Sequence, residues 1–504
     1  MASNYDKHIF RQLEDVLKKC DNLSQEIKDI KKEHKEEIKR LKDQHSEEIH
    51  NLKEEHKKEV KQLNSKIEKL EDENKLLKED NTRMKAILNR DSTNSSIPPS
   101  KDEKPKKKKI NLREKSNKKT GGQKGHKGYH LCKKVVEEKI EKGEFEREVI
   151  NVGKVTNEYK SKYILDLKVK VIAKEYRFYK DENGKYNIPK EFQTDVQYGE
   201  EIKTMCTVLN TEGIVALDRL TNFVSCISHG GIEISKGSVV NFMNELNRKG
   251  QYIIENIKEK LLNKEKMHTD GTSGRCENKN VCVRTHSTED LTLFVPTYGK
   301  GKKHIEETGI LNKFMGLLIH DHETVMYNYG TEHAECNVHI LRYLKGCNEN
   351  TGNKWAIKMR SLLSELNEYR KRLKEKGIEK IERKKLERDS KRYDEIIEEG
   401  YKENKKIKSK YIRQDEQKLL NRLKKYKENH LKFLYDFSVP FDNNLAERDL
   451  RNFKIKLKVS GRFNSMEGMK VYSNIRSIIV TFKKQGKNFY EVINNVYKNI
   501  PVSI

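Results

Sequence analysis

Apolar residues recur at helical spacing through the first ninety positions, and no proline or glycine occurs between about Leu13 and Leu88. The middle of this stretch holds three copies of an eleven-residue unit, which begin at His34, His45 and His56, and this period predicts a straight or slightly right-handed helix. From Val60 the period becomes seven, in two alternating series: Val60, Ile67, Asn74, Asn81 and Leu88, then Leu63, Leu70, Leu77 and Met84. Residues 1–90 are therefore predicted to form a dimerising coiled coil, most simply a parallel dimer, because the two Asn inside the seam favour one register. An isolated solvated helix is the alternative.

Three segments with different patterns follow. Residues 91–134 contain Pro, Ser, Gly and a run of four Lys, and this composition predicts a basic disordered linker. Residues 135–190 alternate polar and apolar side chains, which predicts a small β-rich module with two or three strands. Residues 191–263 are predicted to be helical, with a break at Gly230 and Gly231 and with Ser235 as the cap of a second helix. This last region resembles a helix-turn-helix, and DNA recognition and structural packing explain its second helix equally well.

The pattern changes to strands in residues 264–350. Strand patterns at 266–274, 279–287 and 290–298, a helix at about 302–311 and a strand at 315–321 have the layout of a ribonuclease-H-like fold. Asp270 lies in the first strand and Asp321 closes the fourth. Two carboxylates on adjoining strands, joined by a third acid from a later helix, can hold two divalent ions for phosphoryl transfer.

Charged helix fills residues 351–437, which predicts an all-α insertion into this core, with an apolar face at Leu362, Leu363, Leu366 and Leu373. Trp355, the only Trp, is either a buried anchor or a platform for an unpaired base. Residues 438–504 are predicted to complete the core, beginning with FDNNLAERDLR at 441–451. In that helix Asp442 is the expected N-cap, and the expected buried stripe is Ala446, Leu450, Phe453 and Leu457. The fold class expected for the whole chain is mixed α and α/β.

The composition indicates a partner and a compartment. Of the 504 residues only 34% are hydrophobic and 37% are charged, and the formal charge of +27 indicates a polyanionic partner, with nucleic acid first and an anionic membrane second. No run of about 18 apolar residues could span a bilayer, and the first residues lack the apolar core of a signal peptide. Eight cysteines without a C-x-x-C pair fit reduced thiols. A cytoplasmic protein is therefore expected.

Several segments together resemble one family. FDNNLAERDLR, SGRFNSMEG (460–468), NSSIPPS (94–100), GGQKGHKG (121–128) and the C-x-x-H of Cys336 and His339 are similar to segments of the insertion-sequence-sixty-six family of bacterial DDE transposases. The resemblance implies that Asp270, Asp321 and Glu447 are the catalytic acids and that they hold two Mg²⁺ ions, for which Mn²⁺ can substitute. At Asp270 the chain reads D-G-T where the family commonly has D-E-T. The paired cysteines of the family's zinc-binding module are absent from 135–190, so no zinc is expected.

Other side chains are expected to support the acids or to bind DNA. Cys336, His339 and Asn443 are expected beside the acids, where they pack or hold them in place. Phosphate contacts are expected from a set of basic side chains: Arg448, Arg451, Arg462, Lys106, Lys107, Lys108 and Lys109. Local salt bridges to Asp449 or Glu467 explain the three Arg equally well.

The resemblance implies a DNA transposase that cleaves at the ends of a mobile element and joins the freed 3′-OH to target DNA. Its expected partners are the terminal repeats, target DNA, a second copy paired through the coiled coil, and accessory proteins of the element, at the bacterial nucleoid. The alternative is a catalytically inactive DNA-binding or architectural protein derived from a transposase. A purely structural coiled-coil protein explains residues 13–88 and nothing after them.

Overall fold

The computed structural model describes residues 52–95, 132–152, 160–190 and 194–504, together with Ile27, Asn157 and Phe192. The chain divides into two compact units. The larger unit comprises Met1–Glu103, Val196–Leu220 and Lys236–Ile504, and the smaller comprises Lys104–Asp195 and Thr221–Ser235. The repeat that begins at His34, the first seven residues of the repeat that begins at His45, and the four-Lys run lie outside the described residues.

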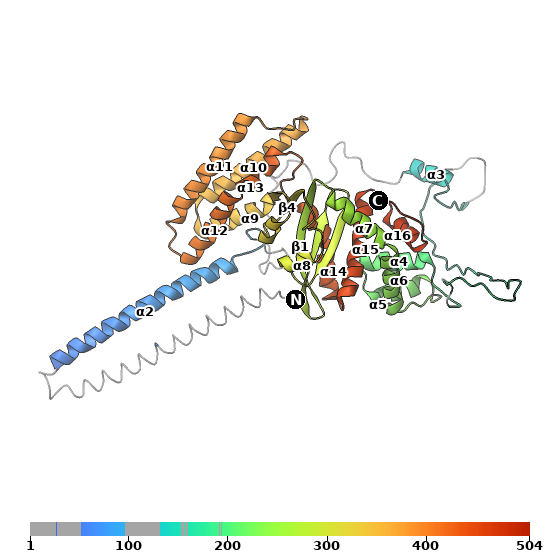
Figure 1. Cartoon of the computed structure of the whole chain (residues 1–504), viewed down its shortest axis with the longest axis horizontal. Helices are drawn as coiled ribbons and strands as arrows, with labels where there is room; N and C mark the ends of the chain where they lie inside the picture. Colours follow the sequence, from blue (N-terminus) through green and yellow to red (C-terminus); the bar gives the residue numbers. More distant parts are fainter. Residues whose placement is uncertain are drawn as a thin grey trace. The chain divides into compact units, whose positions relative to one another are not determined.

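A five-stranded mixed sheet forms the core of the larger unit (Figure 1). Its strands lie in the order β3-β2-β1-β4-β5 and are β1 (Lys266–Cys276), β2 (Lys279–Ser287), β3 (Thr292–Thr297), β4 (Leu317–His320) and β5 (Glu332–Glu335). The first three pair antiparallel, whereas β4 runs parallel to β1 and β5 runs parallel to β4. The sequence pattern predicts the first four strands but not β5, because the four residues EHAE show no alternation of apolar side chains. This mixed α/β core is consistent with a ribonuclease-H-like fold.

Two short helical segments connect the later strands. Helix α8 (Lys302–Glu306) precedes β4, and it ends earlier than the predicted helix at 302–311. A 3₁₀ helix, η2 (Thr324–Asn328), lies between β4 and β5.

Helix α14 (Asn444–Ser460) packs on β1 and β2. Three of the four residues of the predicted apolar stripe, Ala446, Leu450 and Phe453, have no exposed surface, and Leu457 is half-buried. The N-cap prediction is wrong by one residue. Asn443 occupies the N-cap, and Asp442 precedes it and accepts a hydrogen bond from the backbone N–H of Asn444 at 3.0 Å. The burial of one stripe orients the whole helix, and therefore it fixes where the acid of its first turn points.

The larger unit also contains α4 (Glu200–Thr211), α6 (Lys236–Lys249), α7 (Gln251–Leu262), α15 (Met466–Lys484) and α16 (Phe489–Tyr497). Helix α5 (Leu217–Ile227) begins in the larger unit and continues in the smaller. Helices α7 and α15 pack on β3, and α6 packs on α4, α7, α15 and α16. The turn between α5 and α6 contains Gly230 with a φ of 78°, which is the break that the sequence predicts. The buried residues of α6 are Val239, Phe242, Met243 and Leu246, so structural packing accounts for its apolar face. DNA recognition by its other face stays a prediction.

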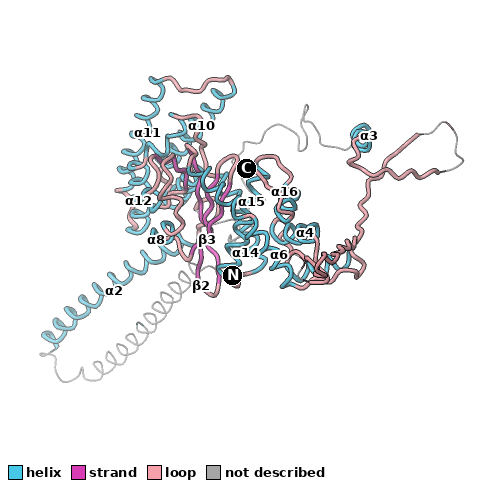
Figure 2. Tube along the Cα trace, turned by 45° about the vertical axis from the view of Figure 1, so that its right-hand side comes forward, coloured by secondary structure: helices cyan, strands magenta, loops and turns pink. Residues whose placement is uncertain are grey.

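The helical insertion comprises α9 (Asn337–Thr351), α10 (Lys354–Glu375), α11 (Arg383–Asn404), α12 (Lys410–Lys425) and α13 (Lys427–Tyr435). Figure 2 shows its helices to one side of the strands, and α13 packs on β5. Trp355 is fully buried in the core of the insertion, and its indole Nε1 donates a hydrogen bond to Glu416 at 2.8 Å. The buried-anchor interpretation of Trp355 is therefore confirmed.

The N-terminal segment is helical where it is described, in α2 (Leu52–Leu88). This helix lies against α12, where Glu79 accepts hydrogen bonds from the hydroxyl of Ser409 and the backbone N–H of Lys410 at 3.0 Å each. Seam positions of the heptad stay open in the single chain, with Ile67 51% exposed and Leu88 53% exposed. Their pairing with a second copy stays a prediction.

The first residues of the predicted disordered linker are ordered. Residues 91–95 form a turn in which the hydroxyl of Ser95 donates to the carbonyl of Asp91 at 2.6 Å, and Asn94 donates to Glu349 of α9 at 2.6 Å. The turn approaches α9 closely because Gly346 has no side chain, and a Cβ there would lie only 2.2 Å from the Asn94 carbonyl oxygen. The prediction of disorder is therefore wrong for 91–95, where hydrogen bonds replace the apolar burial that the composition lacks.

The smaller unit contains α3 (Lys133–Glu141), most of α5 and an extended chain. Its described residues include no strand of a sheet, and Lys180 and Tyr186 form an isolated bridge. The apolar residues of the predicted strands are exposed, for example Ile164 at 93% and Leu167 at 85%. The prediction of a β-rich module is wrong for these residues, because alternation produces a strand only where a neighbouring strand pairs with it.

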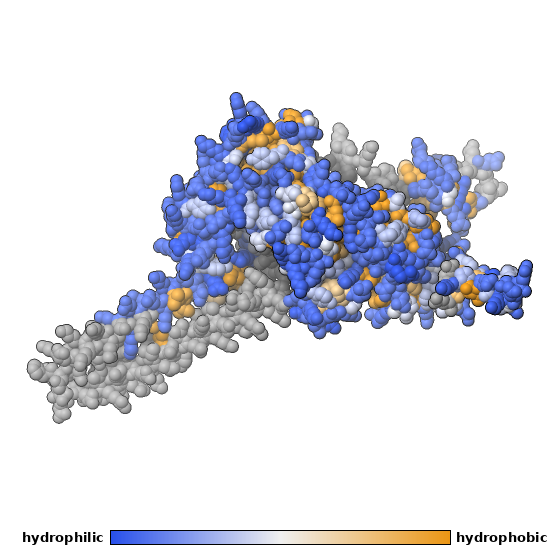
Figure 3. Space-filling view, in the orientation of Figure 1, coloured by the Kyte–Doolittle hydropathy of each residue, from blue (hydrophilic) through white to orange (hydrophobic). Residues whose placement is uncertain are grey.

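The helical insertion has a polar surface. The face drawn in Figure 3 is mostly hydrophilic over α10–α12. Within the described part of the chain, no helix combines the length and the apolarity needed to cross a bilayer.

Candidate active site

The parallel pairing of β1 with β4 brings the two predicted aspartates together. The register pairs His268 with Ile319, so Asp270 and Asp321 follow two residues later on adjoining strands. The backbones of adjoining strands lie about 4.8 Å apart. Both carboxylates therefore lie at the same edge of the sheet, although more than forty residues separate them in the sequence.

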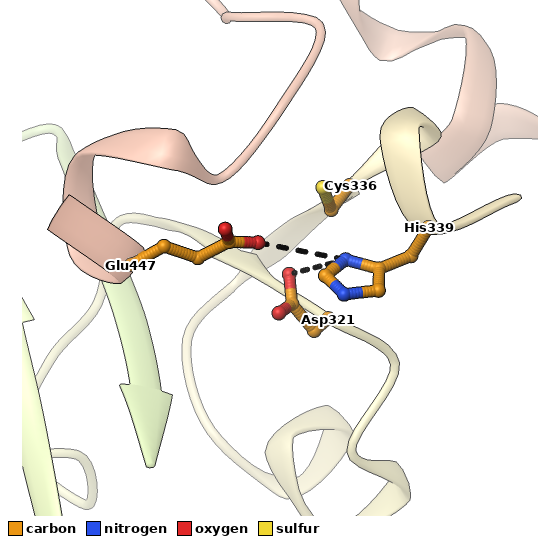
Figure 4. A group of neighbouring side chains, drawn as sticks. All are labelled: Asp321, Cys336, His339 and Glu447. Atoms are coloured by element: carbon orange, nitrogen blue, oxygen red, sulfur yellow. Dashed lines mark ion pairs between the residues drawn. The ribbon is translucent and has the colours of Figure 1, made fainter. Parts of the chain in front are cut away.

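Glu447 reaches this edge from the first turn of α14, and Cys336 and His339 reach it from the start of α9 (Figure 4). The Nδ1 atom of His339 lies 3.5 Å from Oδ1 of Asp321 and 3.8 Å from Oε1 of Glu447. The ligand atoms of Asp321, Cys336, His339 and Glu447 all lie within 4.8 Å of one another. Asp270 lies outside this group of four. The predicted neighbours of the acids are thus brought next to Asp321 and Glu447.

Asn443 connects this group to the sheet. Its fully buried amide donates to Oδ1 of Asp321 at 3.3 Å and to the carbonyl of Thr269 at 2.9 Å, and it pairs with Nδ1 of His268 at 2.9 Å. Because the carbonyl and the carboxylate only accept, the amide oxygen faces His268, whose Nδ1 carries the proton. The backbone N–H of Asn443 also donates to the Cys336 sulfur at 3.3 Å. These bonds hold Asp321 in one orientation.

Negative charge accumulates at this edge of the sheet. Burial, and then the charges of Asp321 and Glu447, raise the pKa of Asp270 to about 6. Burial opposes ionisation of Asp321 too, but the charge of the nearby His339 and the hydrogen bond from Asn443 outweigh it and lower the pKa of Asp321. Burial disfavours the charged form of His339, yet the two carboxylates beside it raise its pKa. A cation bound here would therefore relieve repulsion among the acids.

The donor set fits a divalent cation. The carboxylate oxygens of Asp270, Asp321 and Glu447 are hard ligands of the kind that Mg²⁺ and Mn²⁺ prefer. Oε1 of Glu447 is buried and has no hydrogen-bond partner among the described residues. Such an oxygen costs free energy unless a ligand satisfies it.

A second buried cluster, which the sequence analysis missed, lies beside the acids. The side chain of Glu335 is fully buried at the end of β5 and accepts hydrogen bonds from Nε and Nη2 of Arg422 in α12, at 3.0 and 2.5 Å. It also lies 3.0 Å from Nδ1 of His322, the residue after Asp321. Burial opposes ionisation, but hydrogen bonds from His322 and His430 and the charge of Arg422 lower the pKa of Glu335. No local pattern marks this pair, because 87 residues separate its two members.

The predicted phosphate-binding residues are partly described. Arg448, Arg451 and Arg462 are exposed, and the four lysines of the linker lie outside the described residues. The alternative, in which these Arg form local salt bridges, is weakened for one of its two acids. Asp449 is buried and forms its salt bridge with Lys484 at 2.6 Å. The sequence analysis also missed Lys454, whose charge acts on Asp270 and opposes the rise of its pKa. Lys454 follows Glu447 by seven residues and therefore lies on the same helix face, and this spacing could have predicted its position near the acids.

The fold and this group of acids are consistent with one class of protein. Two aspartates at adjoining strands of a mixed sheet, with a glutamate from a later helix, are the arrangement expected of DDE enzymes, which act on nucleic acid phosphodiesters.

The comparison with protein families identifies the group within this class. Residues 195–471, more than half of the chain, match the family model described as Transposase IS66 family. The chain belongs to this family, and the resemblance seen in its sequence motifs is confirmed.

A similarity to an individual protein is shorter. Over 82 residues the chain is 34% identical to the uncharacterized protein y4jO of Sinorhizobium fredii, and the match covers 16% of this chain and 26% of that protein. The chain thus spans about a quarter of that relative's length, and the match adds no information on activity.

Proposed function

We propose that this chain catalyses transposition of a bacterial insertion sequence by hydrolysis at the element's ends and attack of the freed 3′-OH on target DNA. Membership of the family implies a transposase role. The observation that supports the chemistry is the meeting of Asp270, Asp321 and Glu447 at one sheet edge. Burial, and then the charges of the two other acids, raise the pKa of Asp270 to about 6, which agrees with carboxyl groups that lie close together.

Each residue of the site has a task in this proposal. When bound, two Mg²⁺ ions held by the three acids would activate the attacking oxygen and stabilise the leaving oxygen. Asn443 keeps the carboxylate of Asp321 oriented through its amide, and His268 keeps the amide oriented in turn. The buried stripe of α14 keeps Glu447 at the sheet edge. Arg451 is exposed one turn after Glu447, where a guanidinium would bind a DNA phosphate next to the acids.

The N-terminal helix supports a dimeric enzyme. Helix α2 is held to the insertion through Glu79, and its seam positions Ile67 and Leu88 are exposed for pairing with a second copy. A dimer formed in this way would bring two catalytic sites to the two ends of one element. The formal charge of +27 favours binding of both terminal repeats and target DNA.

The proposal is tested by Mg²⁺-dependent nicking of DNA that carries the repeats flanking the gene. The wild type and Glu491→Gln, a control at an exposed Glu of α16, should cut at the repeat ends. Glu447→Gln should bind the same DNA without cutting it. Binding without cleavage by the wild type, with the element's accessory proteins present, would overturn the proposal and favour an inactive architectural protein.

A further inference from the structure

We infer that Asp321, Cys336, His339 and Glu447 form a four-ligand site for a thiophilic divalent ion such as Zn²⁺, and that Zn²⁺ bound there excludes Mg²⁺ from the acids. The site follows from the geometry of these four side chains. Its consequence for catalysis rests on the proposed function.

The spacing of the four side chains suits such an ion. Zinc lies about 2.0–2.3 Å from its N, O and S ligands, so the ligand atoms of a tetrahedral site are about 3.3–3.8 Å apart. Nδ1 of His339 is already 3.5 Å from the nearest oxygen of Asp321 and 3.8 Å from that of Glu447. All four ligand atoms lie within 4.8 Å of one another. Small side-chain adjustments would therefore close the site.

The chemistry of the donors distinguishes this ion from Mg²⁺. A thiolate, an imidazole and two carboxylates form a set that zinc accepts, whereas Mg²⁺ requires oxygen ligands. Nδ1 of His339 and Oε1 of Glu447 are buried and make no hydrogen bond to another described residue, so both are available to an ion. On binding, the Cys336 thiol would release its proton to solvent as the sulfur–metal bond forms.

The arrangement also gives the ion access. Cys336 lies fully buried at the closed end of the group. The side chains of Asp321 and Glu447 are 21% and 26% exposed, so an ion can reach the site from the side of the acids. The same two acids would serve Mg²⁺, whereas Asp270 lies outside the group of four. A zinc ion would thus occupy two of the three catalytic carboxylates.

This inference changes the expectation that no zinc binds. A Cys and a His supply only half of a zinc site, and the sequence predicts Cys336 and His339 only as side chains that pack beside the acids or hold them in place. The fold supplies the other half, because α9 starts directly opposite the first turn of α14 at the end of β4 (Figure 4).

Cobalt is the spectroscopic probe for this site in the full-length protein. One equivalent of Co²⁺, added without Mg²⁺, should give a sulfur-to-cobalt charge-transfer band and the strong visible bands of four-coordinate cobalt. Cys336→Ser should lose the charge-transfer band and bind Zn²⁺ roughly 10- to 100-fold less tightly, or weaker still. Cys226→Ser, at an exposed cysteine of α5, should keep both. A wild type without the band, or a Cys336→Ser variant that keeps it, would overturn the inference.

Two further variants keep the test independent of folding and of the proposed function. His339→Gln retains the sulfur ligand, so it should keep the charge-transfer band while the visible bands change and the affinity for Zn²⁺ falls. Asp270→Asn should leave the cobalt bands unchanged, because Asp270 is not one of the four ligands, while nicking is lost. If nicking persisted in this variant, the proposed function would fail while the zinc site would stand. Zn²⁺ far below the Mg²⁺ concentration should suppress nicking by the wild type. If Zn²⁺ inhibits nicking by Cys336→Ser as strongly as nicking by the wild type, under conditions in which the variant still nicks DNA, the inhibition comes from another site. That result would refute the exclusion of Mg²⁺ by zinc bound at these four residues.

Discussion

Replacing Glu335 with Gln removes a buried charge from the contact between the sheet and the helical insertion. The side chain of Glu335 is fully buried, and that of Arg422 is only 12% exposed, with 2.5 Å between Oε2 and Nη2. Loss of one member of a buried ion pair costs about 3–5 kcal/mol, because the other charge stays buried without its partner. Gln retains the size of Glu and one acceptor oxygen, so we expect a loss of unfolding free energy at the lower end of this range, about 3 kcal/mol.

The chain contains a convenient reporter for this change. Trp355 is the only Trp, and it is fully buried in the hydrophobic core of the insertion, to which α12 also contributes. Its fluorescence during urea unfolding therefore follows the part of the protein that Arg422 belongs to. With an m-value of about 2 kcal/mol/M, a loss of 3 kcal/mol lowers the urea midpoint by roughly 1.5 M.

The matched control is Glu365→Gln, which breaks an exposed pair with Arg392 at 3.0 Å, where both side chains are about half exposed. An exposed pair of this kind contributes at most about 1 kcal/mol. If Glu335→Gln shifted the midpoint no more than this control does, the reasoning from burial would be refuted.

Three further predictions follow from other contacts. Asn443→Leu leaves the carbonyl of Thr269 and Nδ1 of His268 without their hydrogen-bond partner. We expect it to lower the rate of Mg²⁺-dependent nicking by roughly 10- to 100-fold while DNA binding stays intact. An unchanged nicking rate would exclude an orienting role for Asn443. Gly346→Ala should make residues 91–95 sensitive to limited proteolysis, because its Cβ would lie 2.2 Å from a backbone oxygen, whereas Gly301→Ala has open space and should not. Burial opposes ionisation of Glu212, but Arg476 and Lys483 outweigh it and lower the pKa of Glu212 below 4.5. The charged carboxylate therefore stabilises the folded state fully above pH 4.5, and this stabilisation is lost as the pH falls through the lowered pKa. The stability gap between the wild type and Glu212→Gln, measured by circular dichroism in urea, should therefore be about 1–3 kcal/mol at pH 6 and narrow below pH 4.5, and a gap independent of pH would contradict this.

Much of the core could be predicted because its signals are local. The stripe of α14 depends only on residue spacing within one helix, and the strands β1 to β4 lie within or close to the strand patterns seen in the sequence. The predictions failed where pairing decides the outcome. The residues around Ile164 alternate as a strand does, yet no other described segment pairs with them, whereas β5 has a partner strand but no alternation.

The candidate site divides in the same way. The residue types and the order of Asp270, Asp321 and Glu447 are legible in the chain, through motifs that resemble those of the family. Their meeting depends on the parallel pairing of β1 with β4 and on the docking of α14, which are contacts between distant segments.

The sequence by itself therefore determined the stripe of α14 and the first four strands of the sheet, and it predicted which acids are candidates for the chemistry, since these follow from local spacing, residue type and motifs. Only the tertiary structure decided that Cys336 and His339 lie against two of the acids and that Glu335 is bound by Arg422. Such contacts form between segments that are far apart in the chain, and their energy comes from shared burial, which no local pattern records.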